Sequence, residues 1–147
     1  SGNDKSAKMA FYGADAGNEL SKGLIEEAIE LRGWQDESGT EKIIGTVTIT
    51  NKDFWLNEPL DEDPAVDSPA AGNSDVELPF GQGVTRLLFG GQGGLTAGGA
   101  IQMAAGYEGV GKSAAGGGSQ VLYHIRSRHE GVNNSQQQIR GQWRHLN

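Results

Sequence analysis

The first thirty or so residues of the chain carry apolar side chains at steps of three and four positions. Charged side chains fill the other positions between residues 4 and 32, and no proline interrupts the pattern. This period indicates one long amphipathic helix with an apolar stripe and a charged face. Gly33 follows at the position where a C-terminal cap belongs. The stripe consists of Ala10, Ala14, Gly17, Leu20, Leu24, Ala28 and Leu31, widened by Phe11, Ile25 and Ile29.

Several later segments have the β-branched composition or the two-residue alternation of strands. Residues 43–50, IIGTVTIT, predict a strand, and residues 84–89 predict a second, short one. Residues 101–105 are a candidate for another. Residues 121–126 and 139–146 both alternate, and the turn-rich stretch EGVNNSQ lies between them. This end of the chain is therefore expected to form an antiparallel hairpin.

A long polar segment separates the predicted helix from most of these strands. Residues 57–79 hold all four prolines and seven acidic residues, which predicts an exposed loop. One helix followed by several strands predicts a single α+β domain over residues 1–147, with the helix packed on an antiparallel sheet. The tryptophans stand near element ends, and we interpret them as core or sheet-edge residues whose ring N–H reaches a partner. They are Trp34, Trp55 and Trp143.

Composition narrows the possible chemistry. The chain has no cysteine, which excludes disulfides, zinc–cysteine sites and cysteine nucleophiles. Its formal charge of −7 argues against a nucleic-acid partner. The charge is uneven, because residues 1–118 carry 18 acidic and 8 basic side chains whereas residues 119–147 carry four arginines and one glutamate. We expect the basic end to pair with the acidic remainder or with a neighbouring subunit.

Residues 106–113, GYEGVGKS, match the phosphate-loop pattern at every fixed position. In that motif backbone N–H groups hold phosphates, the lysine (here Lys112) reaches the terminal phosphates, and the hydroxyl (here Ser113) binds Mg²⁺. The motif needs a strand before it and a helix after it, but the glycine-rich AAGGGSQ follows here. No apolar strand ends in an aspartate that would hold the metal. A glycine-rich turn is therefore the favoured interpretation.

Two groups of side chains could in principle hold a metal ion. The acidic loop offers carboxylates that suit calcium, but their spacing does not match an EF-hand, and a solvated loop is the simpler interpretation. His124, His129 and His145 with Glu130 could bind zinc, although alternation on adjacent strands tends to put them on different faces. We therefore expect no catalytic residue, no cofactor and no metal site. The carboxylates of the loop are Asp61, Glu62, Asp63, Asp67, Asp75 and Glu77.

Both ends of the chain resemble one family. Residues 1–19, SGNDKSAKMAFYGADAGNE, resemble the start of the soluble part of PilX-type minor pilins of the type IV pilus. In that family a hydrophobic helix runs into a stretch like AGND-x₄-MAFYAADAGIE. Residues 98–147 are similar to the tail of PilX-like proteins of delta-proteobacterial type. There a glycine-rich stretch leads into strands carrying Arg-Ser, a Gly-x-x-Asn-Ser turn and a final Trp/Tyr-Arg-His. Residues 33–95 carry no such resemblance.

The resemblance implies a pilin-like fold and a structural role in place of catalysis. Minor pilins of this kind form a priming complex with other minor pilins, start polymerisation of the major pilin by the pilus assembly machinery, and end at or near the tip. They lie in the inner membrane and periplasm before assembly and in the extracellular pilus afterwards. The resemblance also implies a prepilin cleavage site and a membrane helix before Ser1. The helical pattern already running at Lys8 agrees with a helix that begins upstream.

The helix is also where contact with partner subunits is expected. Exposed side chains along it are the candidates, although a solvated helix face would account for the same residues. Two other classes stay open: a pseudopilin of a type II secretion system, which shares the helix-plus-sheet plan, and a nucleotide-binding protein resting on GYEGVGKS. The candidate partner-binding residues are Lys8, Tyr12, Asp15, Glu19, Lys22 and Glu26.

Overall fold

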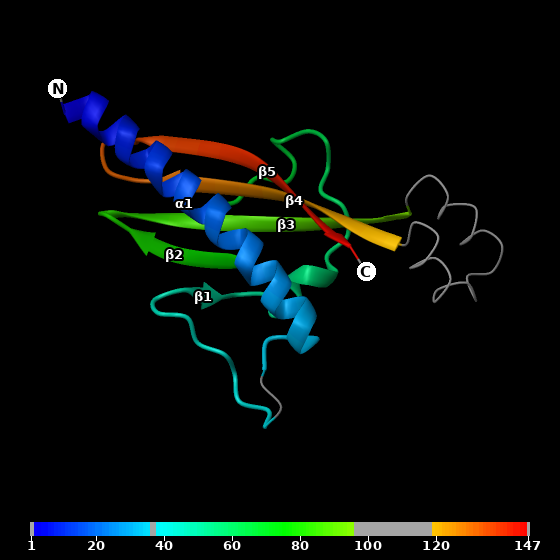
Figure 1. Ribbon diagram of the computed structural model, residues 1–147. Helices are drawn as coiled ribbons and strands as arrows, with labels where there is room; N and C mark the ends of the chain where they lie inside the picture. Colours follow the sequence, from blue (N-terminus) through cyan, green and yellow to red (C-terminus); the bar gives the residue numbers. More distant parts are fainter. Residues whose placement is uncertain (1, 36–37, 96–118, 147) are drawn as a thin grey trace.

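The chain folds as one helix packed on one antiparallel sheet. The computed structural model describes residues 2–35, 38–95 and 119–146. The strands pair antiparallel throughout, in the order β1-β2-β3-β4-β5, and α1 crosses one face of the sheet diagonally (Figure 1). The predicted α+β class is therefore confirmed. The elements are α1 (Gly2–Leu31), β1 (Thr48–Ile49), the 3-10 helix η1 (Phe54–Leu56), β2 (Val76–Phe80), β3 (Gly83–Leu95), β4 (Ser119–Glu130) and β5 (Gln136–Leu146).

The helix buries most of the stripe that its sequence predicts, but the prediction is wrong for Phe11, which is 49% exposed. Leu20 and Leu31 are only half-buried at its margins. Beyond Leu31, Arg32 adopts φ = 54°, and the N–H groups of Arg32 and Gly33 donate to the carbonyls of Ile29 (3.2 Å) and Ala28 (3.0 Å). This is a Schellman end, in which the left-handed residue is Arg32 and not the glycine predicted as the cap. The buried face comprises Ser6, Ala10, Gly13, Ala14, Gly17, Ser21, Leu24, Ile25 and Ala28.

The strand predicted over residues 43–50 is mostly wrong. Only Thr48 and Ile49 pair with a neighbour, opposite Glu77 and Val76 of β2. Gly45 has φ = 52°, and the N–H of Val47 donates to the carbonyl of Ile44 (2.9 Å). The chain therefore turns in the middle of the β-branched run, since a left-handed glycine interrupts an extended backbone.

The hairpin predicted at the end of the chain is confirmed and is longer than expected. β4 and β5 pair over eleven positions, from Gln120 opposite Leu146 to Glu130 opposite Gln136. The turn between them places Asn133 (φ = 58°) and Asn134 (φ = 55°) in the left-handed region, as a type I′ turn requires. The strand predicted at 84–89 is also confirmed, as part of the longer β3. The candidate strand at 101–105 lies outside the described residues.

The predicted loop at 57–79 runs over the sheet face opposite α1 and ends earlier than expected, because residues 76–80 form β2. Asp75 is buried and is not a free acidic side chain. Its carboxylate accepts hydrogen bonds from the side-chain amides of Asn51 (3.0 Å) and Asn57 (2.9 Å) and from the N–H of Phe89 (2.9 Å). A carboxylate with three donors is satisfied without water, so Asp75 fixes the loop around η1 to β3.

The apolar core lies between the C-terminal half of α1 and the sheet. Trp34, Phe54 and Phe89 form a row of rings with centroids 5.9 Å and 4.7 Å apart. The ring N–H of Trp34 donates to the carbonyl of Lys42 (2.7 Å), as expected. The same expectation is wrong for Trp55 and Trp143, whose buried ring nitrogens have no hydrogen-bond partner within the described part of the chain.

Candidate interaction surface at the N-terminal end of the helix

Large apolar side chains are exposed on the third turn of α1. Met9, Phe11 and Tyr12 are 40%, 49% and 55% exposed, and we call these three residues the helix patch. The rings of Phe11 and Tyr12 touch edge to face, with centroids 6.0 Å apart. The opposite side of the same turn is fully buried through Ala10 and Gly13. The patch therefore stands on a helix that is already docked, and its own sheet does not cover it.

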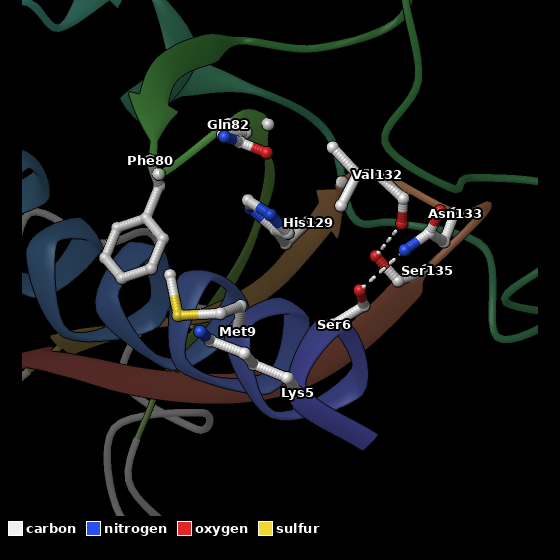
Figure 2. Close-up of a pocket in the computed structure, with 12 residues that line it drawn as sticks. Lys5, Ser6, Met9, Phe80, Gln82, His129, Val132, Asn133 and Ser135 are labelled. Carbon is white, nitrogen blue, oxygen red and sulfur yellow. Dashed lines mark hydrogen bonds between the residues drawn. The ribbon is translucent and has the colours of Figure 1, made fainter. Parts of the chain in front are cut away.

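A cavity of about 460 Å³ opens beside the helix patch. Its walls are the first turns of α1, the β2–β3 turn at residues 80–83 and the β4–β5 turn at residues 131–135 (Figure 2). Met9 and Phe80 contribute apolar surface, and Lys5 lies at the helix side. The cavity thus forms where three segments far apart in sequence meet at one end of the sheet.

His129 of β4 forms part of the cavity wall and is only 2% exposed. The hydroxyl of Thr85 donates to the carbonyl of Gly13 (3.0 Å) and lies 2.9 Å from Nδ1 of His129. A carbonyl can only accept, so the hydroxyl proton belongs to that bond, and Nδ1–H must then donate to the Thr85 oxygen. Nε2 is left as an acceptor. Burial lowers the pKa of His129, and the nearby Glu130 carboxylate offsets part of this effect.

Glycines make room for the imidazole ring. A Cβ on Gly13 would lie 2.4 Å from Nδ1 of His129, and one on Gly83 would lie 2.7 Å from Nε2. A Cβ on Gly131 would lie 3.1 Å from Nε2. The Phe80 ring closes another side edge-on, with its centroid 5.7 Å from the imidazole. His129 is therefore held between helix and sheet by shape as well as by hydrogen bonds.

The other hydroxyl groups at the cavity are already engaged. Ser6 accepts from the side-chain amide of Asn133 (3.1 Å), and Ser135 donates to the carbonyl of Val132 (2.6 Å), as Figure 2 shows. The Asn133–Ser6 bond ties the first turns of α1 to the β4–β5 turn, and the Ser135–Val132 bond lies within that turn. The arrangement offers an apolar recess with one imidazole acceptor, and neither serine is placed as an activated nucleophile beside a base.

The six partner-binding candidates do not share one environment. Four of them, Lys8, Tyr12, Asp15 and Glu19, are exposed along the outer side of α1. Lys22 is half-buried and pairs with Glu19 (3.4 Å). Glu26 is half-buried and lies 2.7 Å from Nδ1 of His145 on β5, so its interpretation as a free exposed residue is wrong. The sequence period found the outer row, but it did not single out Met9, and it wrongly assigned the exposed Phe11 to the buried stripe.

The structure separates the residues of both metal hypotheses. His129 faces α1, His145 faces Glu26, and His124 lies at a different cavity on the other face. Within residues 2–35, 38–95 and 119–146, no three histidine or acidic side chains gather as metal ligands. In the acidic loop, Asp75 is used by the asparagines described above, and Glu77 pairs with Arg86 (2.9 Å). The motif GYEGVGKS, with Lys112 and Ser113, lies outside the described residues.

Comparisons with protein-family models, curated proteins and solved structures find no match to this chain. Across the described ranges, no helix has both the length and the apolar character needed to cross a membrane.

Proposed function

We propose that this chain is the globular domain of a minor pilin of the type IV pilus. In this role it is a structural subunit that joins other minor pilins to prime the assembly of the major pilin, and it ends at or near the pilus tip. Before assembly it sits at the inner membrane with its globular part in the periplasm, held by a membrane helix upstream of α1. A pseudopilin of a type II secretion system is the related alternative, because it shares the same plan.

The helix patch carries the proposal. Its residues Met9, Phe11 and Tyr12 belong to the stretch MAFYGADAG, which is part of the segment that resembles PilX-type pilins. They are exposed although the helix beneath them is docked. A helix with apolar groups on its free side can pack against a second helix, and burying one such side chain contributes about 1.5–3 kcal/mol.

The arrangement of α1 is compatible with assembly through that helix. One side of the helix is committed to the sheet, through bonds such as Ser127 Oγ to the carbonyl of Ala14 (2.6 Å). The outer side carries both signs of charge, with Lys8, Asp15 and Glu19 exposed. Charges around an apolar centre can pair with complementary charges on a neighbouring subunit and so help to fix its orientation.

The proposal is tested in the organism that carries the gene. Deleting the gene should reduce surface pili without changing synthesis of the major pilin, and the intact gene should restore them. A gene encoding Phe11→Ser with Tyr12→Ser should fail to restore pili although the protein accumulates normally. The matched control is Val66→Ser, which also removes an exposed apolar side chain (58% exposed) but on the loop, far along the chain from the helix.

Either of two outcomes would refute the proposal. One is normal piliation in the deletion strain when no sister minor pilin compensates. The other is full restoration by the doubly substituted patch. Loss of secretion of a folded enzyme with pili intact would instead support the pseudopilin alternative.

A further inference from the structure

A second cavity, of about 840 Å³, lies on the sheet face opposite α1. Its floor is formed by β4 and β5, and one wall is the start of the acidic loop at residues 59–62. The side chains that reach it from the sheet are rich in hydrogen-bond donors. They are His124, Arg126, Arg140, Gln142 and, from β3, Gln92.

Two arginines stand directly opposite each other in this floor. Arg126 of β4 is the register partner of Arg140 of β5. Like charges placed opposite each other across two strands repel and destabilise the pair. Such a pair needs a counter-charge, either from the protein itself or from a ligand.

The same face contains a second arginine pair, which serves as an internal comparison. Arg86 of β3 is the register partner of Arg128 of β4. Glu77 lies 2.9 Å from Arg86, and Glu130 lies 3.5 Å from Arg86 and 3.4 Å from Arg128. Here the chain neutralises its own pair with two carboxylates.

The pair at the cavity has no carboxylate in direct ion-pair contact, although Asp61 and Glu62 of the loop line the same cavity. Arg126 is 5% exposed and donates to the backbone carbonyls of Asp61 and Asp67, which carry no net charge. Within the described part of the chain, neither Arg126 nor Arg140 has a carboxylate at ion-pair distance. The Asp61 carboxylate accepts from the N–H of Asp63 (2.8 Å) in its own loop. A buried cation without a directly paired carboxylate is costly, and an anion bound at the neighbouring Arg140 would offset part of that cost.

We propose that this cavity binds a single anionic group, a carboxylate or a phosphate, between Arg140 and the rim formed by His124 and Gln142. Arg140 is exposed and supplies a planar pair of donors that matches either group. Arg126 contributes its positive charge from below. His124 and Gln142, which are register partners, provide a polar edge. The site does not depend on the proposed pilin role, since it lies on the face of the sheet away from the helix patch.

Titration with inorganic phosphate and with acetate, followed by NMR at constant pH and ionic strength, tests the site. We expect saturable shifts at the Arg140 guanidinium and the Gln142 amide. Arg140→Gln should weaken the affinity by about tenfold, because it removes charge-assisted bonds. The control is Arg144→Gln, on the same strand and the same face but outside the cavity, which should change affinity by less than about twofold. Both positions are exposed, so both variants should fold.

The two anions distinguish the natural source. Tighter binding of phosphate indicates a phosphorylated ligand, and equal or tighter binding of acetate indicates an acidic side chain of a partner. Shifts that never saturate with either anion would overturn the proposal. Equal weakening by Arg140→Gln and Arg144→Gln would overturn it as well, since that result means diffuse attraction and no site.

Discussion

The close approach of α1 to the sheet depends on Gly17, and replacing it tests one of the tight contacts between helix and sheet. A Cβ on Gly17 would lie 2.5 Å from Ser127 Oγ, 2.6 Å from Thr85 Cγ2 and 2.9 Å from Leu87 Cδ2. All three neighbours are buried. Thr85 and Ser127 also donate to the helix carbonyls of Gly13 and Ala14. Alanine therefore forces the helix away from the sheet and stretches both bonds.

The expected change in the free energy of unfolding of Gly17→Ala is the balance of opposing effects. Alanine in a helix interior is about 1 kcal/mol more favourable than glycine. Overpacking a tight interior costs about 1–3 kcal/mol, and each weakened buried hydrogen bond adds about 1 kcal/mol. With both bonds weakened, Gly17→Ala should therefore lower the free energy of unfolding by about 2–4 kcal/mol. Gly23→Ala is the matched control, because nothing lies within 4 Å of a Cβ there, and it should raise stability by about 1 kcal/mol.

Urea unfolding followed by circular dichroism measures both variants under one condition. Because about 1 kcal/mol corresponds to about 2–4 °C for a chain of this size, the two melting temperatures should also differ clearly and in opposite directions. Equal stability of Gly17→Ala and Gly23→Ala would mean that the helix is not seated on Thr85 and Ser127 in solution.

Three further outcomes are expected. Leu24→Asp puts an unpaired charge in the core and should lower the free energy of unfolding, measured in urea, by about 3–5 kcal/mol. Glu19→Ala, on the exposed face, should lower it by less than about 0.5 kcal/mol. Equal losses would mean that the buried face of the helix is assigned wrongly. The folded-state pKa of His129 lies below its unfolded value of about 6.5, so on acidification the unfolded chain takes up a proton first, and the free energy of unfolding should fall as pH drops below about 6.5. This loss should be smaller in His129→Gln. If the variant and the unchanged protein lose stability equally over this pH range, the imidazole is not buried in its neutral form. Calorimetry should detect no ATP binding at residues 106–113, and micromolar binding abolished by Lys112→Ala would restore the nucleotide hypothesis.

The periodic pattern of apolar residues predicts the long helix and the terminal hairpin, because both repeat one backbone conformation over many residues. The three- and four-residue steps of α1 persist over many residues, so both ends of the helix are predicted to within two residues. The alternation of β4 and β5 predicts their hairpin but misses residues 127–130 and 136–138 beside the turn. The run at 43–50 fails because one glycine, Gly45, adopts a left-handed conformation within an otherwise strand-like sequence. Nothing in the alternation of its neighbours distinguishes that turn from an extended backbone.

The sites are harder to predict, because they are made by contacts between distant residues. Gly13 meets Thr85 and His129, which lie on two different strands, and no spacing along the chain indicates that encounter. The burial of Arg126 is missed for the same reason. Alternation places Arg126 on the outer face of its strand, and only the acidic loop folding across that face covers it.

Helix and loop cover opposite faces of one sheet, and this separates the two proposed surfaces physically. The helix patch rests on Ala10 and Gly13, whereas the anion cavity rests on the cross-strand neighbours Arg126 and Arg140. Substitutions that share no contacts usually act additively on stability. A protein that combines Tyr12→Ser with Arg140→Gln should therefore show the sum of the two single losses of stability. If binding at one face changed the affinity at the other, the coupling would have to pass through β4, where Arg126 faces the cavity and its neighbour Ser127 holds the helix.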